Sequence, residues 1–112
     1  MRIIFCGSGS FAVPSLQALL GGSHEIVMVV TQPSRSAGRG GRLTATPVAM
    51  ACQAAGREAW QCEDANDPAA VEKIKAAGAD VMAVADFGQF IQAPARAAVR
   101  VDAINLHGSL LP

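Results

Sequence analysis

Two side chains capable of polar catalysis, Asn105 and His107, lie two positions apart near the end of the sequence. Side chains on a β-strand alternate between its two faces, so a strand here would direct both of them to one face and Leu106 to the other. An amide N–H can donate a hydrogen bond to a developing oxyanion, and an imidazole can donate one and also transfer a proton. The spacing suggests a joint catalytic role, although a histidine in a strand is more often a structural residue.

The segment after His107 supports the catalytic interpretation. Residues 108–112 begin with small side chains and continue as an apolar stretch that could wall a pocket. Open α/β sheets bind their ligands at the carboxyl ends of parallel strands, which is where this segment would lie.

Residues 32–46 form the second candidate site, since they break all periodicity and carry Arg35, Arg39 and Arg42 among several glycines. A charged run of this kind is usually a solvated surface. Irregular segments of this length are nevertheless uncommon in compact domains and are often functional. Guanidinium groups bind phosphate oxygens in a two-pronged geometry, so this long, flexible loop is a candidate for contact with nucleic acid.

A glycine-rich turn at residues 7–12 fits the pattern G-x-G-x-x-A that begins many dinucleotide-binding domains. Such a site also needs an acidic residue about twenty positions later, at the end of the second strand. Thr31 and Gln32 stand there instead. The pattern therefore favours a tight strand-to-helix turn, whose amides could hold an anion, over a nicotinamide site.

Composition limits the chain to one small domain. It has 112 residues, of which 51% are hydrophobic and 16% charged, as expected for a globular core and not for a disordered tail. The formal net charge is zero, which excludes nucleic-acid binding through a generally basic surface. Any contact with RNA must be local.

The cysteines and the N-terminus indicate a soluble protein of a reducing cytoplasm. Cys6, Cys52 and Cys62 are odd in number and form no C-x-x-C pair, so neither a disulfide framework nor a zinc site is expected. The first apolar run stops at Gly7, too early for a signal peptide, and no run approaches the roughly 20 apolar residues of a membrane span. No protein partner is predicted.

Buried strands and helices alternate along the chain. Apolar runs predict strands at residues 2–6, 26–31, 81–85 and 103–106, with a shorter one at 58–61. Helical spacing, prolines and glycines predict helices over residues 14–20, 47–55, 67–77 and 94–99. This order predicts a Rossmann-like, three-layer α/β/α fold with a mainly parallel sheet.

Several motifs resemble one enzyme family. The run from Asn105 to Pro112, N-L-H-G-S-L-L-P, resembles the N-[LVI]-H-x-S-L-L-P signature of the folate-dependent formyltransferases. The runs F-A-V-P-S-L at residues 11–16, V-V-T-Q-P at 29–33 and A-G-R-G at 37–40 resemble the opening segments of the members that formylate methionyl-tRNA.

The resemblance implies transfer of a formyl group from 10-formyltetrahydrofolate to the amino group of initiator methionyl-tRNA in translation initiation. It implies that Asn105 and His107 are catalytic and that the segment with Arg35, Arg39 and Arg42 meets the tRNA, Arg39 matching the most characteristic arginine. The residues it implies for the folate pocket are Phe87, Gly88, Gln89, Phe90, Ile91, Ser109, Leu110, Leu111 and Pro112.

Two departures from the family pattern leave alternatives open. Ser8-Gly9-Ser10 replaces the usual Thr-Pro-acidic turn and is similar to the phosphate-holding loop of glycinamide ribonucleotide formyltransferases. Asp86-Phe87-Gly88 stands where a Tyr-Gly pair is usual, so pterin contacts should be made mostly by the backbone. An acceptor such as glycinamide ribonucleotide or an amino sugar, and a non-catalytic folate- or nucleotide-binding module, therefore remain alternatives.

The chain stops directly after a predicted strand, before the helix that would cover it. Residues 1–112 are therefore expected to be the first part of a catalytic domain that is incomplete at its C-terminus. The resemblance implies that the remainder would supply a catalytic aspartate and a C-terminal β-barrel domain that helps to bind tRNA.

Overall fold

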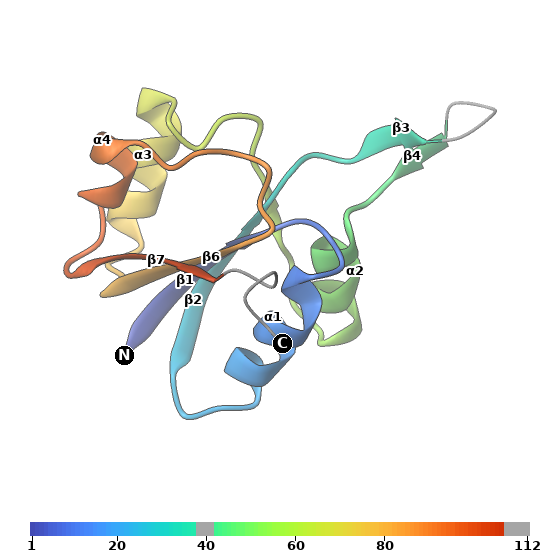
Figure 1. The fold of residues 1–112 in the computed structure, drawn as a ribbon, viewed down its shortest axis with the longest axis horizontal. Helices are drawn as coiled ribbons and strands as arrows, with labels where there is room; N and C mark the ends of the chain where they lie inside the picture. The colour runs from blue at the N-terminus through green and yellow to red at the C-terminus, as the bar shows by residue number, and fades with distance from the viewer. Residues whose placement is uncertain (38–41, 107–112) are drawn as a thin grey trace.

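A five-stranded parallel sheet forms the centre of the computed structural model, which describes residues 1–37 and 42–106 (Figure 1). The strand order is β5-β2-β1-β6-β7, and every neighbouring pair is parallel. The strands are β1 (Arg2–Gly7), β2 (Glu25–Thr31), β5 (Trp60–Gln61), β6 (Val81–Ala85) and β7 (Asp102–Leu106). The predicted parallel sheet is confirmed, although β5 is only half as long as predicted.

Helices cover both faces of this sheet, which confirms the Rossmann-like α/β/α architecture (Figure 1). One face carries α1 (Ala12–Leu20) and α2 (Pro47–Ala54), and the other carries α3 (Pro68–Ala76) and the short α4 (Ala93–Arg96). A capping side chain and a first-turn proline begin α2 and α3: Thr46 accepts from the amide of Ala49, and Asp67 from that of Ala69, each at 3.1 Å.

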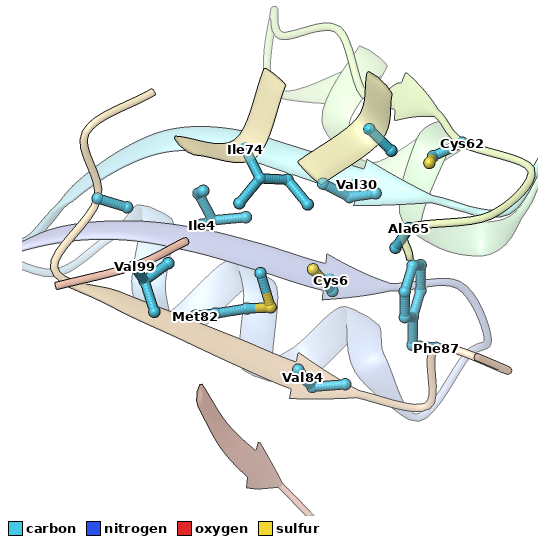
Figure 2. Packing of buried hydrophobic residues seen from close by; sticks show 12 residues of the cluster. Ile4, Cys6, Val30, Cys62, Ala65, Ile74, Met82, Val84, Phe87 and Val99 are labelled. Atoms are coloured by element: carbon cyan, nitrogen blue, oxygen red, sulfur yellow. The ribbon is translucent and has the colours of Figure 1, made fainter. Parts of the chain in front are cut away.

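Alternation along β1 divides the core into two clusters. Ile4 and Cys6 face α3 and pack with Ile74 and Met82, as Figure 2 shows. Ile3 and Phe5 face α1 and α2 on the other side of the sheet. Because helices cover both faces of β1, its sequence is apolar without interruption from Ile3 to Cys6.

Residues 32–46 correct the prediction of a structureless loop. β3 (Arg35–Ala37) and β4 (Arg42–Thr44) pair antiparallel as a hairpin that projects away from the sheet (Figure 1). The ribbon is held by backbone pairing and does not pack on the core, since Leu43 is 74% exposed. A strand that buries no face carries no hydrophobic pattern, so periodicity does not reveal it.

β7 corrects the prediction of a second fully buried strand. It pairs only with β6 within the described residues, and most of its side chains are exposed, including Ile104 at 52% and Leu106 at 38%. On the opposite face Ala103 packs against the cluster beneath α3. A strand of this apolar composition is expected to have two covered faces, and the described residues cover only one.

The three buried thiols make stability depend on pH. Burial raises the pKa of Cys6, Cys52 and Cys62 above the ordinary value of 9.0, most strongly for Cys6, where the neighbouring Cys62 adds to the effect. Above about pH 9 the unfolded state then binds fewer protons than the folded state, so the free energy of unfolding should fall as pH rises. Each thiol lowers it by up to about 1.4 kcal/mol for every pH unit.

Urea unfolding of the purified protein between pH 7 and 10 tests this expectation. Cys6→Ala removes the thiol with the largest pKa increase and should flatten the decline above pH 9, whatever it costs in stability at pH 7. An equally steep decline in this variant would contradict the assignment.

Candidate functional site

Asn105 lies at the C-terminal end of β7, opposite Val84 of β6. It shares the α3 face of the sheet with Ala103, since the two are separated by one residue in the strand. Asn105 and the segment after β6 line a cleft of about 370 Å³. We call residues 86–91 the rim loop. The amide of Asn105 is exposed and available to a ligand in this cleft.

Other predicted residues fall outside the described part of the chain. These are His107, Ser109, Leu110, Leu111, Pro112 and Arg39. Arg42 lies in β4, where only its backbone is described. The shared face of Asn105 and His107 therefore stays a prediction from their spacing.

The rim loop contains all the predicted pocket residues that are described. Phe87 is 2% exposed and packs into the core near Ala65 (Figure 2), so its side chain anchors the loop. Phe90 is 90% exposed, and Ile91 is half-buried. Gly88 is exposed and has a φ of +85°, a conformation that favours glycine. A ligand would meet backbone and Phe90 more readily than the Phe87 ring.

Two side-chain amides, from Gln89 and Asn66, fasten the rim loop to residues 62–66. The Oε1 of Gln89 accepts from the amide of Ala65 at 2.8 Å, and its Nε2 donates to the carbonyl of Cys62 at 3.0 Å. Asn66 Nδ2 donates to the carbonyl of Phe90 at 2.6 Å. Sequence reasoning missed Asn66, because only the folded chain brings these segments together.

The glycine-rich turn after β1 is tight, as predicted, and is tied to the rim loop. The amides of Ser8 and Gly9 donate to the carbonyl of Asp86, at 2.9 and 3.1 Å, and Ser8 Oγ donates to the carbonyl of Phe87 at 3.0 Å. A Cβ on Gly9 would collide with the Asp86 carboxylate, so a larger residue there would require the Asp86 side chain to move. Both amides already donate to a backbone carbonyl, so they are not available to an anion.

Asp86 combines three features of this region. It lines the cleft with Asn105, its carboxylate lies against Gly9, and its φ of 47° is unusual for a residue other than glycine. Backbone conformations of this kind cost free energy and are concentrated at functional sites. The segment Asp86-Phe87-Gly88, where the sequence departs from the usual Tyr-Gly pair, thus lies at the edge of the cleft.

Arg35 lies on the hairpin with its side chain exposed, and its guanidinium is 3.8 Å from the carboxylate of Glu63. An exposed pair at this distance contributes little to stability, so Arg35 can exchange Glu63 for another anion at low cost. The described residues contain no group of three or more potential metal ligands, and none of their helices is long and apolar enough to cross a membrane.

Comparison with known proteins assigns the chain to a family. The model of the Formyl transferase family matches residues 1–112, the whole chain. The chain belongs to the formyl transferase family. Among its relatives, the proteins named methionyl-tRNA formyltransferase from Thermobifida fusca, Chloroflexus aurantiacus and Thiobacillus denitrificans are 43%, 45% and 41% identical to it over 112 residues. The match covers all of this chain and 36% of each relative.

Formyl transferase membership confirms the family inferred from the signature at Asn105. It also replaces the nicotinamide interpretation of the turn at Gly7, which already lacked an acidic partner. The chain spans about a third of the length of these relatives.

Proposed function

We propose that residues 1–112 are the first part of the catalytic domain of a methionyl-tRNA formyltransferase. The whole enzyme would transfer the formyl group of 10-formyltetrahydrofolate to the amino group of initiator methionyl-tRNA, for translation initiation in a reducing cytoplasm. The observation that carries the proposal is the exposed amide of Asn105 beside the rim loop, in a chain of the formyl transferase family. The names of its relatives support the choice of acceptor.

The reaction needs a preorganised donor at the formyl oxygen. The unprotonated amine attacks the formyl carbon, the C=O π electrons move to oxygen, and a tetrahedral oxyanion forms. Collapse of this intermediate breaks the bond to N10, which must gain a proton as it leaves, while the attacking amine loses one. Asn105 would donate to the oxyanion, and a protonated His107 would donate the second hydrogen bond and relay the proton to N10.

The described cleft suits the pterin end of a folate. Its volume of about 370 Å³ lies within the usual range for small-molecule sites. Val84 is among its lining residues, and the exposed Gly88 offers its backbone for recognition. In this proposal residues 109–112 would complete the wall, and a carboxylate from a later part of the enzyme would orient His107.

The hairpin would meet the acceptor end of the tRNA. It projects from the sheet, carries Arg35 with an exposed side chain, and includes the position of Arg39 between its strands. Arginine suits this task because its planar guanidinium pairs with phosphate oxygens. The alternative acceptor, glycinamide ribonucleotide, would be held by the Ser8-Gly9-Ser10 turn, but the amides of Ser8 and Gly9 are bonded to Asp86.

Replacing Arg39 should separate these acceptors. In the full-length enzyme, Arg39→Ala is expected to raise the KM for methionyl-tRNA about tenfold, since a charged hydrogen bond contributes about 1.5–3 kcal/mol. At saturating methionyl-tRNA the KM for 10-formyltetrahydrofolate should stay unchanged. The measurement is initial-rate formylation of charged initiator tRNA, with the product separated by acid gel electrophoresis.

Arg100→Ala is the matched control, because Arg100 pairs with Asp80 next to the N-terminal end of β6 and is 78% exposed. It removes the same charge and should leave the KM for tRNA unchanged. If the unaltered enzyme formylates glycinamide ribonucleotide or an amino sugar but not methionyl-tRNA, the proposed acceptor is wrong. If it binds folate and formylates none of them, the chain belongs to a non-catalytic binding module.

A further inference from the structure

Gln32 connects the base of the hairpin to the rim loop. It follows β2 directly and begins the segment that leads to β3. Its Oε1 accepts a hydrogen bond from Gln89 Nε2 at 3.0 Å, and its backbone amide donates to Ser8 Oγ at 3.0 Å. Its Nε2 lies close to Gly88, since a Cβ placed on that glycine would be 2.9 Å from the Nε2 atom. Gln32 thus contacts the rim loop at two consecutive residues.

The amide of Gln89 is fully occupied by the protein. Its Nε2 has two hydrogens and meets three oxygens, those of Gln32 at 3.0 Å, Cys62 at 3.0 Å and Glu63 at 3.3 Å. Its Oε1 accepts from the amide of Ala65. Because no N–H is left for a ligand, Gln89 acts on the cleft by fixing the rim loop.

The first strand of the hairpin is attached to the same segment that holds Gln89. The amide of Ser34 donates to Gln61 Oε1 at 2.8 Å, and Arg35 lies 3.8 Å from Glu63. A tRNA bound to the hairpin would therefore affect the positions of residues 61–65 and of Gln32 together. Both of these contact Gln89 through side-chain or backbone oxygens.

We infer that the Gln32–Gln89 hydrogen bond couples the hairpin to the folate cleft, so that tRNA on the hairpin strengthens binding of the folate donor. Gln32 is then a positioning residue that touches neither the formyl group nor the pterin. Coupling between two ligands is reciprocal, so the donor must strengthen tRNA binding by the same factor. The inference rests on the proposed function, because it assumes tRNA on the hairpin and folate at the rim loop.

Gln32→Leu tests the coupling, because it removes the acceptor oxygen at similar side-chain size. Gln89 keeps its bonds to the carbonyls of Cys62 and Glu63, so the variant should fold. Donor affinity is measured by calorimetry on the full-length enzyme with and without uncharged initiator tRNA, which offers no amine and prevents turnover. We expect tRNA to tighten donor binding about fivefold in the unaltered enzyme, at the low end of typical coupling, and not at all in Gln32→Leu.

Steady-state kinetics and two further variants separate positioning from a general structural role. Gln32→Leu should raise the KM for the donor about fivefold at saturating methionyl-tRNA and leave kcat within about twofold. Gln32→Glu keeps an acceptor oxygen for Gln89 Nε2 and should retain the coupling, as should Gln53→Ala on the exposed side of α2.

Three results would overturn the inference. The first is a donor affinity that tRNA does not change in the unaltered enzyme. The second is a Gln32→Leu enzyme that keeps the coupling. The third is a Gln32→Leu enzyme with a lower kcat and an unchanged donor KM, which would indicate a merely structural role. Failure of the unaltered enzyme to formylate methionyl-tRNA is a separate outcome that removes the proposed function itself.

Discussion

Replacing Asn105 by alanine is expected to lower kcat for formyl transfer by about a hundredfold or more, the usual cost of losing one preorganised donor to an oxyanion. The amide is exposed at the edge of the cleft and is not needed to hold the core, so the loss should fall on catalysis and not on folding. The KM for either substrate should change little, because the oxyanion exists only during the reaction.

Two companion variants sharpen this prediction. Asn105→Asp keeps the size of the side chain but presents an anion to the oxyanion, so its kcat should be at least as low as that of Asn105→Ala. Val101→Ala, just before β7 and 70% exposed, should retain the kcat of the unaltered enzyme. Single-turnover rates at saturating substrates measure the effect, and an Asn105→Ala rate within threefold of the unaltered rate would remove Asn105 from the catalytic residues.

Replacing Phe5 by alanine should produce the largest loss of stability, about 3–5 kcal/mol in the free energy of unfolding. Phe5 is fully buried on the α1 and α2 face of β1, where it packs among Leu16, Val29 and Val48. Removing its ring takes away buried apolar surface and leaves a cavity that the surrounding helices and strands can close only in part.

Phe11→Ala makes the same chemical change on the surface. Phe11 is 76% exposed, so this variant should differ from the unaltered protein by no more than about 0.5 kcal/mol. The comparison uses the urea midpoint of the full-length protein followed by circular dichroism. Midpoints that fall equally in both variants would contradict the packing described for β1.

The parts of the fold that the sequence predicts are those that bury an apolar pattern. β6 was predicted at its observed bounds because helices cover both of its faces and it is apolar throughout. α3 was predicted from the Asp67-Pro68 start and from Gly78, which has a φ of +65° beyond its end. Capping and burial leave local signals, and local signals are readable from one sequence.

The hairpin could not be predicted in this way, and the composition of β7 alone did not indicate its exposure. β3 and β4 are held by backbone pairing on the surface, and such pairing leaves no apolar periodicity in the sequence. β7 has the composition of a buried strand, whereas its burial depends on what packs against it. Neither property is encoded in the local periodicity of the residues concerned.

The candidate site shows the same difference between local and long-range features. Asn105 was identified from its spacing to His107 and from a signature, and the described cleft includes it. The contacts that shape the cleft join residues far apart in sequence, such as Gln32 and Gln89, which are 57 positions apart, and Asn66 and Phe90, which are 24 apart. An amide in a loop has no pattern that reveals its partner, so only the folded chain identifies these contacts.

We propose that Asn105 and His107 meet at the oxygen on which negative charge develops. The most direct measurement is a crystal structure of the full-length enzyme with a non-transferring analogue of 10-formyltetrahydrofolate. We predict that Asn105 Nδ2 and an imidazole nitrogen of His107 both lie about 2.7–3.1 Å from the oxygen that represents the formyl oxygen. Side chains on opposite faces of the sheet, or an analogue bound away from Asn105, would contradict the account.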